Sequence, residues 1–269
     1  MDIDHLSAVS QTLIIPVWAR AMESRHAQPL FEDRLAEELM NRLKPDTSDF
    51  QNAKLSQVGT ACRTVIFDEE VTDFIEKHPQ SIVINLGAGL DTRAFRLSRL
   101  PFAAWYEIDL PEVMALRESL LANADPRVHT IAADVLKPEW CEKIVKEADQ
   151  AVLMIAEGLS MYFSEAQVRA WLSLLASRFP GALMLLEALC PLMAHNQRLH
   201  DAVKNGARFQ WTVRHSRDIE SYDSRLSWVG DRLLIEKAPA RWGIYYFFAR
   251  LPWLGTWLNQ RIVKIRFQQ

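Results

Sequence analysis

The sequence lacks the features that mark several specialised classes of protein. Its cysteines, Cys62, Cys141 and Cys190, are odd in number and scattered, so they form neither a disulfide framework nor the spacing of a metal site. Acidic residues, Asp2 and Asp4, stand at the N-terminus, where a secretory signal peptide would carry basic ones. These absences predict a cytoplasmic protein in a reducing environment, without a bound metal.

Long apolar runs and an excess of positive charge are missing as well. The most aromatic stretch, residues 242–258, is interrupted by Arg250 and Pro252 and is too short to span a bilayer. The formal net charge of −3 argues against a nucleic-acid-binding protein. Residues 190–269 hold 13 Lys and Arg against 6 Asp and Glu, whereas residues 1–189 hold 18 against 28. The basic C-terminal third is consistent with an anionic acceptor, or with two solvated faces of different sign.

The chain is organised around residues 81–95, where a run of β-branched residues leads into Gly87 and Gly89. The run predicts a strand that is buried on both faces, and Asp91 or Thr92 can cap the helix that follows. A glycine turn between a strand and a helix lets a ligand approach the backbone closely. Thr92 replaces the third glycine of the G-x-G-x-x-G pattern, which disfavours binding of a phosphate. Two interpretations remain: the loop binds a nucleoside, or it is an ordinary tight turn without a ligand.

Alternating strands and helices follow this turn and predict the fold. Such alternation is typical of an α/β, Rossmann-like fold with a mostly parallel sheet and helices on both faces. Two further strands close together suit an antiparallel edge. The seven strands are expected near residues 81–86, 103–110, 128–135, 151–157, 182–189, 227–237 and 261–267.

The residues before the first strand have helical spacing, and the last of these helices is expected around residues 65–76. We expect a single domain in four parts. These are a helical N-terminal cap over residues 1–79, a core over residues 80–189, an acceptor-binding insertion over residues 190–225, and C-terminal strands with the aromatic segment over residues 226–269.

Glycines or acids stand at the carboxyl end of each of the first five strands. Because these ends meet at one edge of a parallel sheet, they predict a shared ligand site, although any single acid is equally explained as an exposed loop carboxylate. Carboxylates suit a ribose diol, an adenine amine, an ammonium or a sulfonium, and they repel a pyrophosphate. S-adenosylmethionine has this set of groups, and its own carboxylate needs a cation, preferably an arginine. The residues in question are Gly87, Gly89, Glu107, Asp109, Asp134, Val135, Glu157 and Glu187.

Three motifs in this region resemble those of one family. Residues Asn85-Leu-Gly-Ala-Gly-Leu-Asp-Thr-Arg93, Tyr106-Glu-Ile-Asp-Leu-Pro111 and Ala156-Glu-Gly-Leu-Ser-Met-Tyr162 closely resemble the leucine carboxyl methyltransferase and tetracenomycin-type polyketide O-methyltransferase family. Upstream, Ile14-Ile-Pro-Val-Trp-Ala-Arg20 and Cys62-Arg63-Thr64 are similar as well. The resemblance extends over residues 13–189 and fades after Cys190, and it implies a class I methyltransferase fold with S-adenosyl-L-methionine as cofactor.

The resemblance also implies a role for each cofactor-binding position. Arg63 matches the arginine that binds the methionine carboxylate, and Arg20 falls close to a second cationic position. A structural ion pair is the alternative role of either arginine. Gly87 and Gly89 would lie under the methionine tail, Asp109 would hold the ribose, Asp134 and Val135 the adenine, and Glu157 would lie near the methionine portion.

The implied reaction is attack of an acceptor oxygen on the methyl carbon. A carboxylate acceptor, which titrates near ~4, is ionised at neutral pH and needs no general base, whereas a phenol, near ~10, needs one. Candidates for such a catalytic residue are Tyr162, Glu187, His195, His200 and His215, and each histidine is otherwise a surface residue.

We therefore expect an S-adenosylmethionine-dependent O-methyltransferase for a carboxylate or hydroxyl of a small molecule in secondary metabolism. Methylation of a protein C-terminal carboxylate is the alternative within the family. A nicotinamide-dependent oxidoreductase and a non-catalytic binding module are the alternatives from other classes. The expected partner is a small-molecule acceptor, with no nucleic acid and no membrane span. For residues 242–258 core packing is the favoured interpretation, ahead of a lid or wall for an apolar acceptor and of contact with a membrane surface or a carrier protein.

Overall fold

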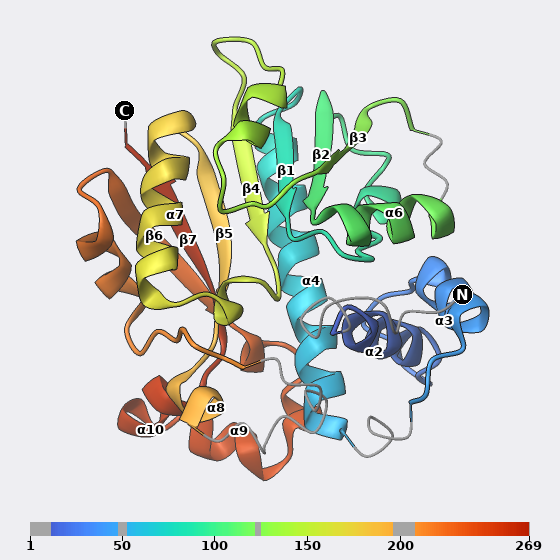
Figure 1. Ribbon diagram of the computed structural model, residues 1–269. Helices are drawn as coiled ribbons and strands as arrows, with labels where there is room; N and C mark the ends of the chain where they lie inside the picture. The colour runs from blue at the N-terminus through green and yellow to red at the C-terminus, as the bar shows by residue number, and fades with distance from the viewer. Residues whose placement is uncertain (1–11, 48–52, 122–124, 196–207, 269) are drawn as a thin grey trace.

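The computed structural model describes residues 12–47, 53–121, 125–195 and 208–268. Its centre is a seven-stranded sheet with the order β3-β2-β1-β4-β5-β7-β6 (Figure 1). Strands β1 to β5 run parallel, and β7 is antiparallel to both β5 and β6. The predicted seven-stranded, mostly parallel sheet is confirmed. The strands are β1 (Ile82–Leu86), β2 (Ala104–Asp109), β3 (Val128–Ala132), β4 (Val152–Ala156), β5 (Leu183–Ala188), β6 (Leu226–Leu233) and β7 (Arg261–Phe267).

Helices lie on both faces of the sheet and across its carboxyl edge. Short 3₁₀ helices connect several of these elements, for example at Ser160–Tyr162 after β4. The α-helices are α2 (Ile14–Ser24), α3 (Arg34–Leu43), α4 (Lys54–Lys77), α5 (Arg93–Arg96), α6 (Pro111–Leu120), α7 (Glu165–Arg178), α8 (Pro191–His195), α9 (Ile244–Ala249) and α10 (Pro252–Leu258).

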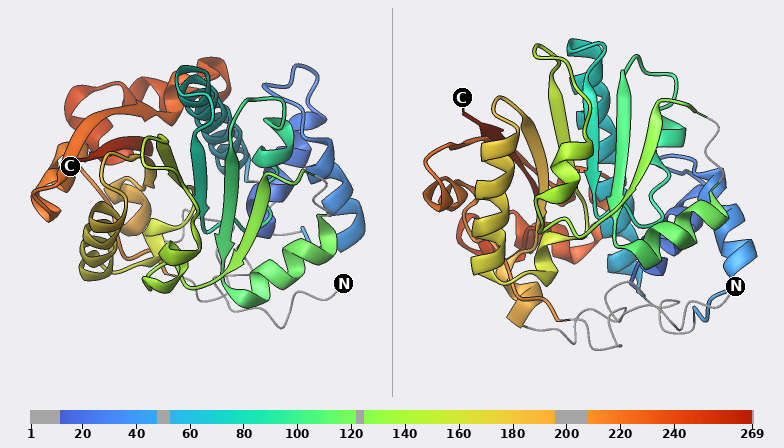
Figure 2. Two further views of the ribbon diagram at one scale, coloured as in Figure 1. Left: turned by 90° about the horizontal axis from the view of Figure 1, so that it is seen from above. Right: turned by 45° about the horizontal axis from the view of Figure 1, so that its top comes forward.

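Successive side chains of the central strands are buried on opposite faces. Ile84 and Met154 belong to the cluster that packs against α7, whereas Val83 and Leu153 belong to the cluster that packs against α4. Figure 2 shows these two helices on opposite sides of the sheet. Burial on both faces explains why the parallel strands are continuous apolar runs rather than alternating ones.

The N-terminal helices differ in part from the prediction. Helices α2 and α3 pack with α6 over the loop that follows β1, as expected of a cap. The helix expected at residues 65–76 begins earlier, at Lys54, and most of its length packs on the sheet. Among the described helices before β1, α2 and α3 thus lie over the glycine loop, whereas α4 packs mostly on the sheet.

Helix caps explain several of the boundaries. Ser164 and Gln167 form a capping box at the start of α7, and Pro111 is the first residue of α6. The helix expected after the glycine loop is only one turn long. Its Thr92 hydroxyl donates to Asp33, 2.5 Å away, and does not cap the helix.

The prediction of core packing for residues 242–258 is wrong for much of this segment. The side chains of Ile244, Phe247 and Trp253 are 74%, 72% and 70% exposed. Tyr245 and Leu254, in contrast, turn inward and line a cavity. The segment forms two short helices between β6 and β7, so its residues have a solvent side and a cavity side.

In the ranges that the structure describes, no helix is long and apolar enough to cross a membrane. Within the same ranges, no cluster of His, Cys, Asp or Glu is arranged to hold a metal ion. All three cysteines are buried, unpaired thiols.

Candidate active site

A cavity of about 730 Å³ lies at the carboxyl ends of the parallel strands. In the strand order, β2 lies on one side of β1, and the chain later returns to place β4 on the other side of β1. Ligands of open α/β sheets bind where the strand order reverses in this way. The volume is in the upper part of the range for small-molecule sites, so it can accommodate more than one small ligand.

The glycine loop forms part of the cavity wall. Gly87 and Gly89 have φ angles of +72° and +48°, which residues with a side chain adopt with strain. A Cβ atom on Gly87 would lie 2.9 Å from Cδ1 of Leu159. The amide of Gly87 donates to the carbonyl oxygen of Ile108, and the amide of Gly89 donates to Oδ2 of Asp109 at 2.7 Å. The loop is thus fixed to β2, with its backbone open to a ligand.

Two predicted carboxylates line the cavity beside this loop. Asp109 accepts a second amide hydrogen bond, from Leu110, and burial raises the pKa of its carboxyl group against the effect of the two amides. Asp134 accepts from the amide of Leu136 through Oδ1, and its Oδ2 has no hydrogen-bond partner among the described residues. The neighbouring Val135 is buried and lines the cavity too.

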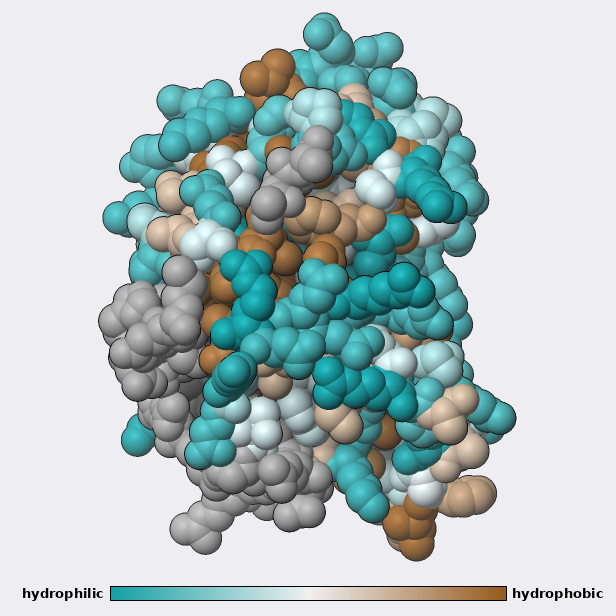
Figure 3. All heavy atoms as spheres, turned by 90° about the vertical axis from the view of Figure 1, so that its right-hand side faces the viewer, coloured by the Kyte–Doolittle hydropathy of each residue, from teal (hydrophilic) through white to brown (hydrophobic). Residues whose placement is uncertain are grey.

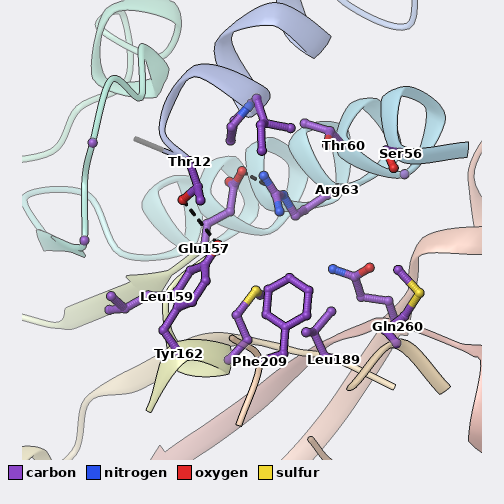
Figure 4. A pocket seen from close by; sticks show the side chains of 18 of the residues that line it. Thr12, Ser56, Thr60, Arg63, Glu157, Leu159, Tyr162, Leu189, Phe209 and Gln260 are labelled. Atoms are coloured by element: carbon purple, nitrogen blue, oxygen red, sulfur yellow. Dashed lines mark hydrogen bonds and ion pairs between the residues drawn. The ribbon is translucent and has the colours of Figure 1, made fainter. Parts of the chain in front are cut away.

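Arg63 reaches the cavity from α4. Its Nη1 donates to both carboxylate oxygens of Glu187, at 3.0 and 3.1 Å, and its Nε lies 2.9 Å from Oε1 of Glu157. Nη2 has no hydrogen-bond partner in the described part of the chain. Burial would raise the pKa of the Glu157 carboxyl, but the guanidinium groups of Arg63 and Arg93 hold that pKa below its usual value. Figure 4 shows Arg63 and Glu157 across the cavity from Phe209 and Leu189.

Arg20 is held in a similar way. Its Nε donates to Asp33 at 2.9 Å and its Nη2 donates to the carbonyl oxygen of Leu90 at 2.8 Å. Nη1 has no hydrogen-bond partner within the described ranges, and Arg20 lines the cavity. Arg20 and Arg63 therefore each make structural ion pairs and each keep one terminal nitrogen without a hydrogen-bond partner among the described residues, so the ion-pair role does not exclude the predicted cofactor role.

Sequence reasoning missed the arginine that joins these groups. Arg93 is fully buried and pairs with Glu157 at 2.6 Å, Asp91 at 2.5 Å and Asp68 at 2.7 Å. The expected row of carboxylates is therefore an alternating array of carboxylates and guanidinium groups. The motif itself contained a signal, since Arg93 lies two residues after Asp91, shortly after the glycine loop. No signal in the sequence indicated its distant partner Asp68.

Two of the predicted acids do not reach the cavity. Glu107 is fully buried, accepts from Asn85 at 2.8 Å and lies 3.1 Å from Arg117, and burial raises its pKa to about 7 despite the arginine. Glu187 is also fully buried, and its oxygens accept from Arg63, Gln260 and the amide of Gly158. The structure gives no support to Glu187 as a catalytic base, because its oxygens already accept these hydrogen bonds and the residue does not line the cavity.

The other candidates differ in how far the structure places them. Tyr162 lines the cavity, its hydroxyl lies 3.2 Å from Oγ1 of Thr12, and burial raises its pKa. His215 is exposed and is not part of the cavity wall. The side chain of His195 and the whole of His200 lie outside the described residues.

Beyond Arg63 the cavity becomes an apolar chamber. Its walls come from the residues after β5, from the connection between β6 and β7, and from α9 and α10. The cavity thus has a polar part near β1 to β4 and an apolar part near β5 to β7. The chamber is lined by Leu189, Cys190, Leu192, Met193, Phe209, Leu234, Ile235, Trp242, Tyr245, Phe248, Leu254 and Leu258.

Comparison with known proteins gives consistent matches. The model of the leucine carboxyl methyltransferase family matches residues 14–176. The tetracenomycin polyketide synthesis O-methyltransferase TcmP of Streptomyces glaucescens is 30% identical over 218 residues, which cover 81% of this chain and 80% of TcmP. The S-adenosyl-L-methionine-dependent methyltransferase dpfgK of Gibberella zeae is 22% identical over 280 residues, covering 94% and 92% of the two chains.

Solved structures show the same fold at lower identity. A candidate methyltransferase of Thermobifida fusca is 18% identical, with a TM-score of 0.59 over 93% of this chain and 94% of its own. The magnesium protoporphyrin IX methyltransferase of Synechocystis, solved with bound S-adenosylhomocysteine, is 13% identical, with a TM-score of 0.51 over 88% and 100%. The predicted Rossmann-like class I methyltransferase fold is confirmed.

Proposed function

We infer the function from one premise: the chain belongs to the leucine carboxyl methyltransferase family and is an S-adenosyl-L-methionine-dependent methyltransferase. On this basis we propose that it methylates an oxygen, that of a carboxylate in preference to a hydroxyl, on an apolar small-molecule acceptor. The main support is a single cavity that joins a polar part at the strand ends to an apolar chamber.

The polar part fits the cofactor. Oδ2 of Asp134 is an acceptor without a described partner, which suits the adenine amine, and Asp109 retains acceptor capacity for ribose hydroxyls. The open backbone at Gly87 would lie under the methionine tail. Nη2 of Arg63 and Nη1 of Arg20 would pair with its carboxylate.

When bound, S-adenosylmethionine supplies an electrophilic methyl group on a sulfonium. The residues of this chain then have to align the acceptor and exclude water. Arg63 and Glu157 hold one side of the passage between the two parts of the cavity, and Phe209 and Leu189 form the opposite side (Figure 4). Alignment and exclusion of water are sufficient when the nucleophile is already an anion.

The titratable groups of the chamber favour a carboxylate acceptor. Among the described residues that line it, these groups are Cys190 and Tyr245, and Tyr162 lines the cavity beside it, next to Phe209; burial raises the pKa of all three. They stay protonated at neutral pH and cannot accept a proton from a phenol. Tyr162 instead offers a hydroxyl that can hydrogen-bond to the acceptor.

The alternatives have less support. The family assignment and Thr92 in the third glycine position speak against a nicotinamide-dependent oxidoreductase. A protein C-terminus needs an open groove for the preceding chain, whereas this chamber is walled by aromatic and aliphatic side chains from several elements.

Calorimetry and a matched acceptor panel would test the proposal. S-adenosylhomocysteine should bind and NAD should not. With S-adenosylmethionine, apolar carboxylic acids should be converted to methyl esters at a rate that changes little with pH above neutrality, because the nucleophile is already ionised. If only phenols are methylated, at a rate that rises toward their pKa near ~10, the preference for carboxylates is refuted. Absence of S-adenosylhomocysteine binding would refute the whole assignment.

A further inference from the structure

The outer surface of α9 and α10 is apolar although it faces solvent. Ile244, Phe247 and Phe248 have the i, i+3, i+4 spacing of one face of α9 and are exposed, although Phe248 also lines the chamber, and Leu251, just before α10, is exposed as well. Trp253 and Trp257 repeat the pattern on α10. Six of the ten exposed large hydrophobic side chains in the described part of the chain thus fall within residues 244–257.

The same two helices present an apolar face to the cavity. Tyr245 and Leu254 line the chamber from inside. The helices cannot easily turn their outer face inward, because they are tightly packed against each other. A Cβ atom on Gly255 would lie 2.6 Å from the carbonyl oxygen of Ala249, to which the side-chain amide of Asn259 donates at 2.8 Å. A helix that is apolar on all sides belongs in a protein interior or beside a second apolar phase.

Positive charge borders this face. No Asp or Glu occurs after Glu236, whereas residues 237–269 contain six Lys and Arg. The guanidinium group of Arg250 lies 5.5 Å from the ring centre of Tyr246, and that of Arg214 lies 4.9 Å from the ring centre of Trp257. Both arginines are exposed, and neither has a carboxylate partner in the ranges described. They remain available to an anion.

We propose that the face formed by Ile244, Phe247, Phe248, Leu251, Trp253 and Trp257 docks on an anionic phospholipid surface. Aromatic and aliphatic side chains beside arginines are the composition of interfacial helices, in which the rings enter the headgroup boundary and the cations bind phosphates. Figure 1 shows α9 and α10 at the lower edge of the molecule, and Figure 3 shows another side of it, which is mainly hydrophilic with a few hydrophobic side chains. Two projecting helices suit a fluid surface better than they suit the capture of a protein segment.

Docking would bring a lipid-dissolved acceptor to the chamber, because one helix pair forms both the chamber wall and the docking face. This consequence rests on the proposed function, whereas docking itself does not. The test therefore measures binding to vesicles, without turnover.

The full chain would be sedimented with vesicles of phosphatidylcholine and with vesicles that also contain phosphatidylglycerol. The wild-type protein should bind the anionic vesicles, less so at high salt, and should bind phosphatidylcholine weakly. The double variant Phe247→Ser/Trp253→Ser should lose about tenfold or more of this binding, because both side chains are mostly exposed in the free protein and would be buried in lipid. Arg250→Glu should weaken binding to anionic vesicles alone.

The matched control is Val145→Ser/Val229→Ser, which removes two exposed apolar side chains elsewhere on the surface and should bind as the wild type does. Neither Phe247 nor Trp253 lines the cavity, so the docking variant should keep its affinity for S-adenosylhomocysteine, which also reports that it is folded. Equal binding by the docking variant and the control would overturn the proposal. Failure of the wild-type protein to bind vesicles would also overturn the proposal. This includes the case in which a dimer covers the α9–α10 face and the double variant dissociates that dimer.

Discussion

The adenine end of the proposed site can be tested with one conservative change, Asp134→Asn. Oδ1 of Asp134 accepts from the amide of Leu136 at 3.0 Å, and an asparagine oxygen can keep that bond. The atom that changes is the one without a described partner, where a carboxylate oxygen becomes an amide nitrogen. An acceptor that faces the cavity is thus replaced by a donor, with little effect on the local turn.

The expected loss follows from the kind of bond. A hydrogen bond to a charged group contributes about 1.5–3 kcal/mol. Asp134 is only half-buried, so solvent weakens the interaction and the lower part of this range applies. A loss of about 1.5–2 kcal/mol corresponds to roughly 10- to 30-fold weaker binding of S-adenosylhomocysteine.

Titration calorimetry would measure this loss, and a modified ligand would assign it. S-inosylhomocysteine, in which an oxygen replaces the adenine amine, should bind Asp134→Asn better than it binds the wild type, because the asparagine amide can donate to that oxygen. Asp149→Asn, at an exposed position, removes the same charge away from the cavity and should change neither affinity. If Asp134→Asn binds both ligands as the wild type does, while its unfolding free energy is unchanged, Asp134 does not contact the base.

Three further changes test other parts of the site. Asp109→Ala removes the acceptor beside the glycine loop and should weaken S-adenosylhomocysteine binding by about 1.5–3 kcal/mol in calorimetry; unaltered affinity would place the ribose elsewhere. Arg63→Met leaves Glu157 and Glu187 buried without their shared cation, and urea denaturation should show that the free energy of unfolding falls by about 3–5 kcal/mol. A small decrease would mean that the array of carboxylates and guanidinium groups is dispensable for stability. The arginines beside Asp33 overcome the effect of burial and lower the pKa of the Asp33 carboxyl in the folded state. The ionised carboxylate therefore stabilises the folded protein above the unfolded-state pKa, which is near ~4, and this contribution is lost as the pH falls further. The difference in unfolding free energy between the wild type and Asp33→Asn should therefore shrink between about pH 5 and pH 3, and a constant difference would contradict this ionisation state.

The sheet could be predicted because its strands are buried on both faces and are separated by helices with clear periodicity. The position of each acid relative to a strand end was harder to predict. Asp109 is the last residue of β2, and Glu157 directly follows β4; both line the cavity. Glu107 is two residues before the end of β2 and Glu187 is one residue before the end of β5, and both are buried inside the sheet. Because each residue advances a strand by about 3.3 Å, a boundary error of one or two residues moves a carboxylate from the cavity into the core.

The aromatic segment reveals a second limit. Its composition predicts burial, but composition does not show on which side a helix meets protein. Tyr245 and Phe247 are two residues apart, and only the first is turned toward the chamber. Contacts between α9 and α10, such as the close approach of Gly255 to Ala249, determine which side of the segment faces the chamber. No periodicity within the segment predicts these contacts.

Arg20 and Arg63 could be identified from the motifs, but the carboxylates with which Arg63 pairs could not, because Glu157 and Glu187 lie far downstream of it in the chain. These distant contacts bear on function as well as on the fold. A free arginine loses side-chain entropy when it binds a ligand, whereas Arg63 is already fixed by its two carboxylates, and its Nη2 has no hydrogen-bond partner among the described residues. Glu157, which pairs with both Arg63 and Arg93, therefore acts on the proposed cofactor site by positioning the guanidinium group before any ligand arrives.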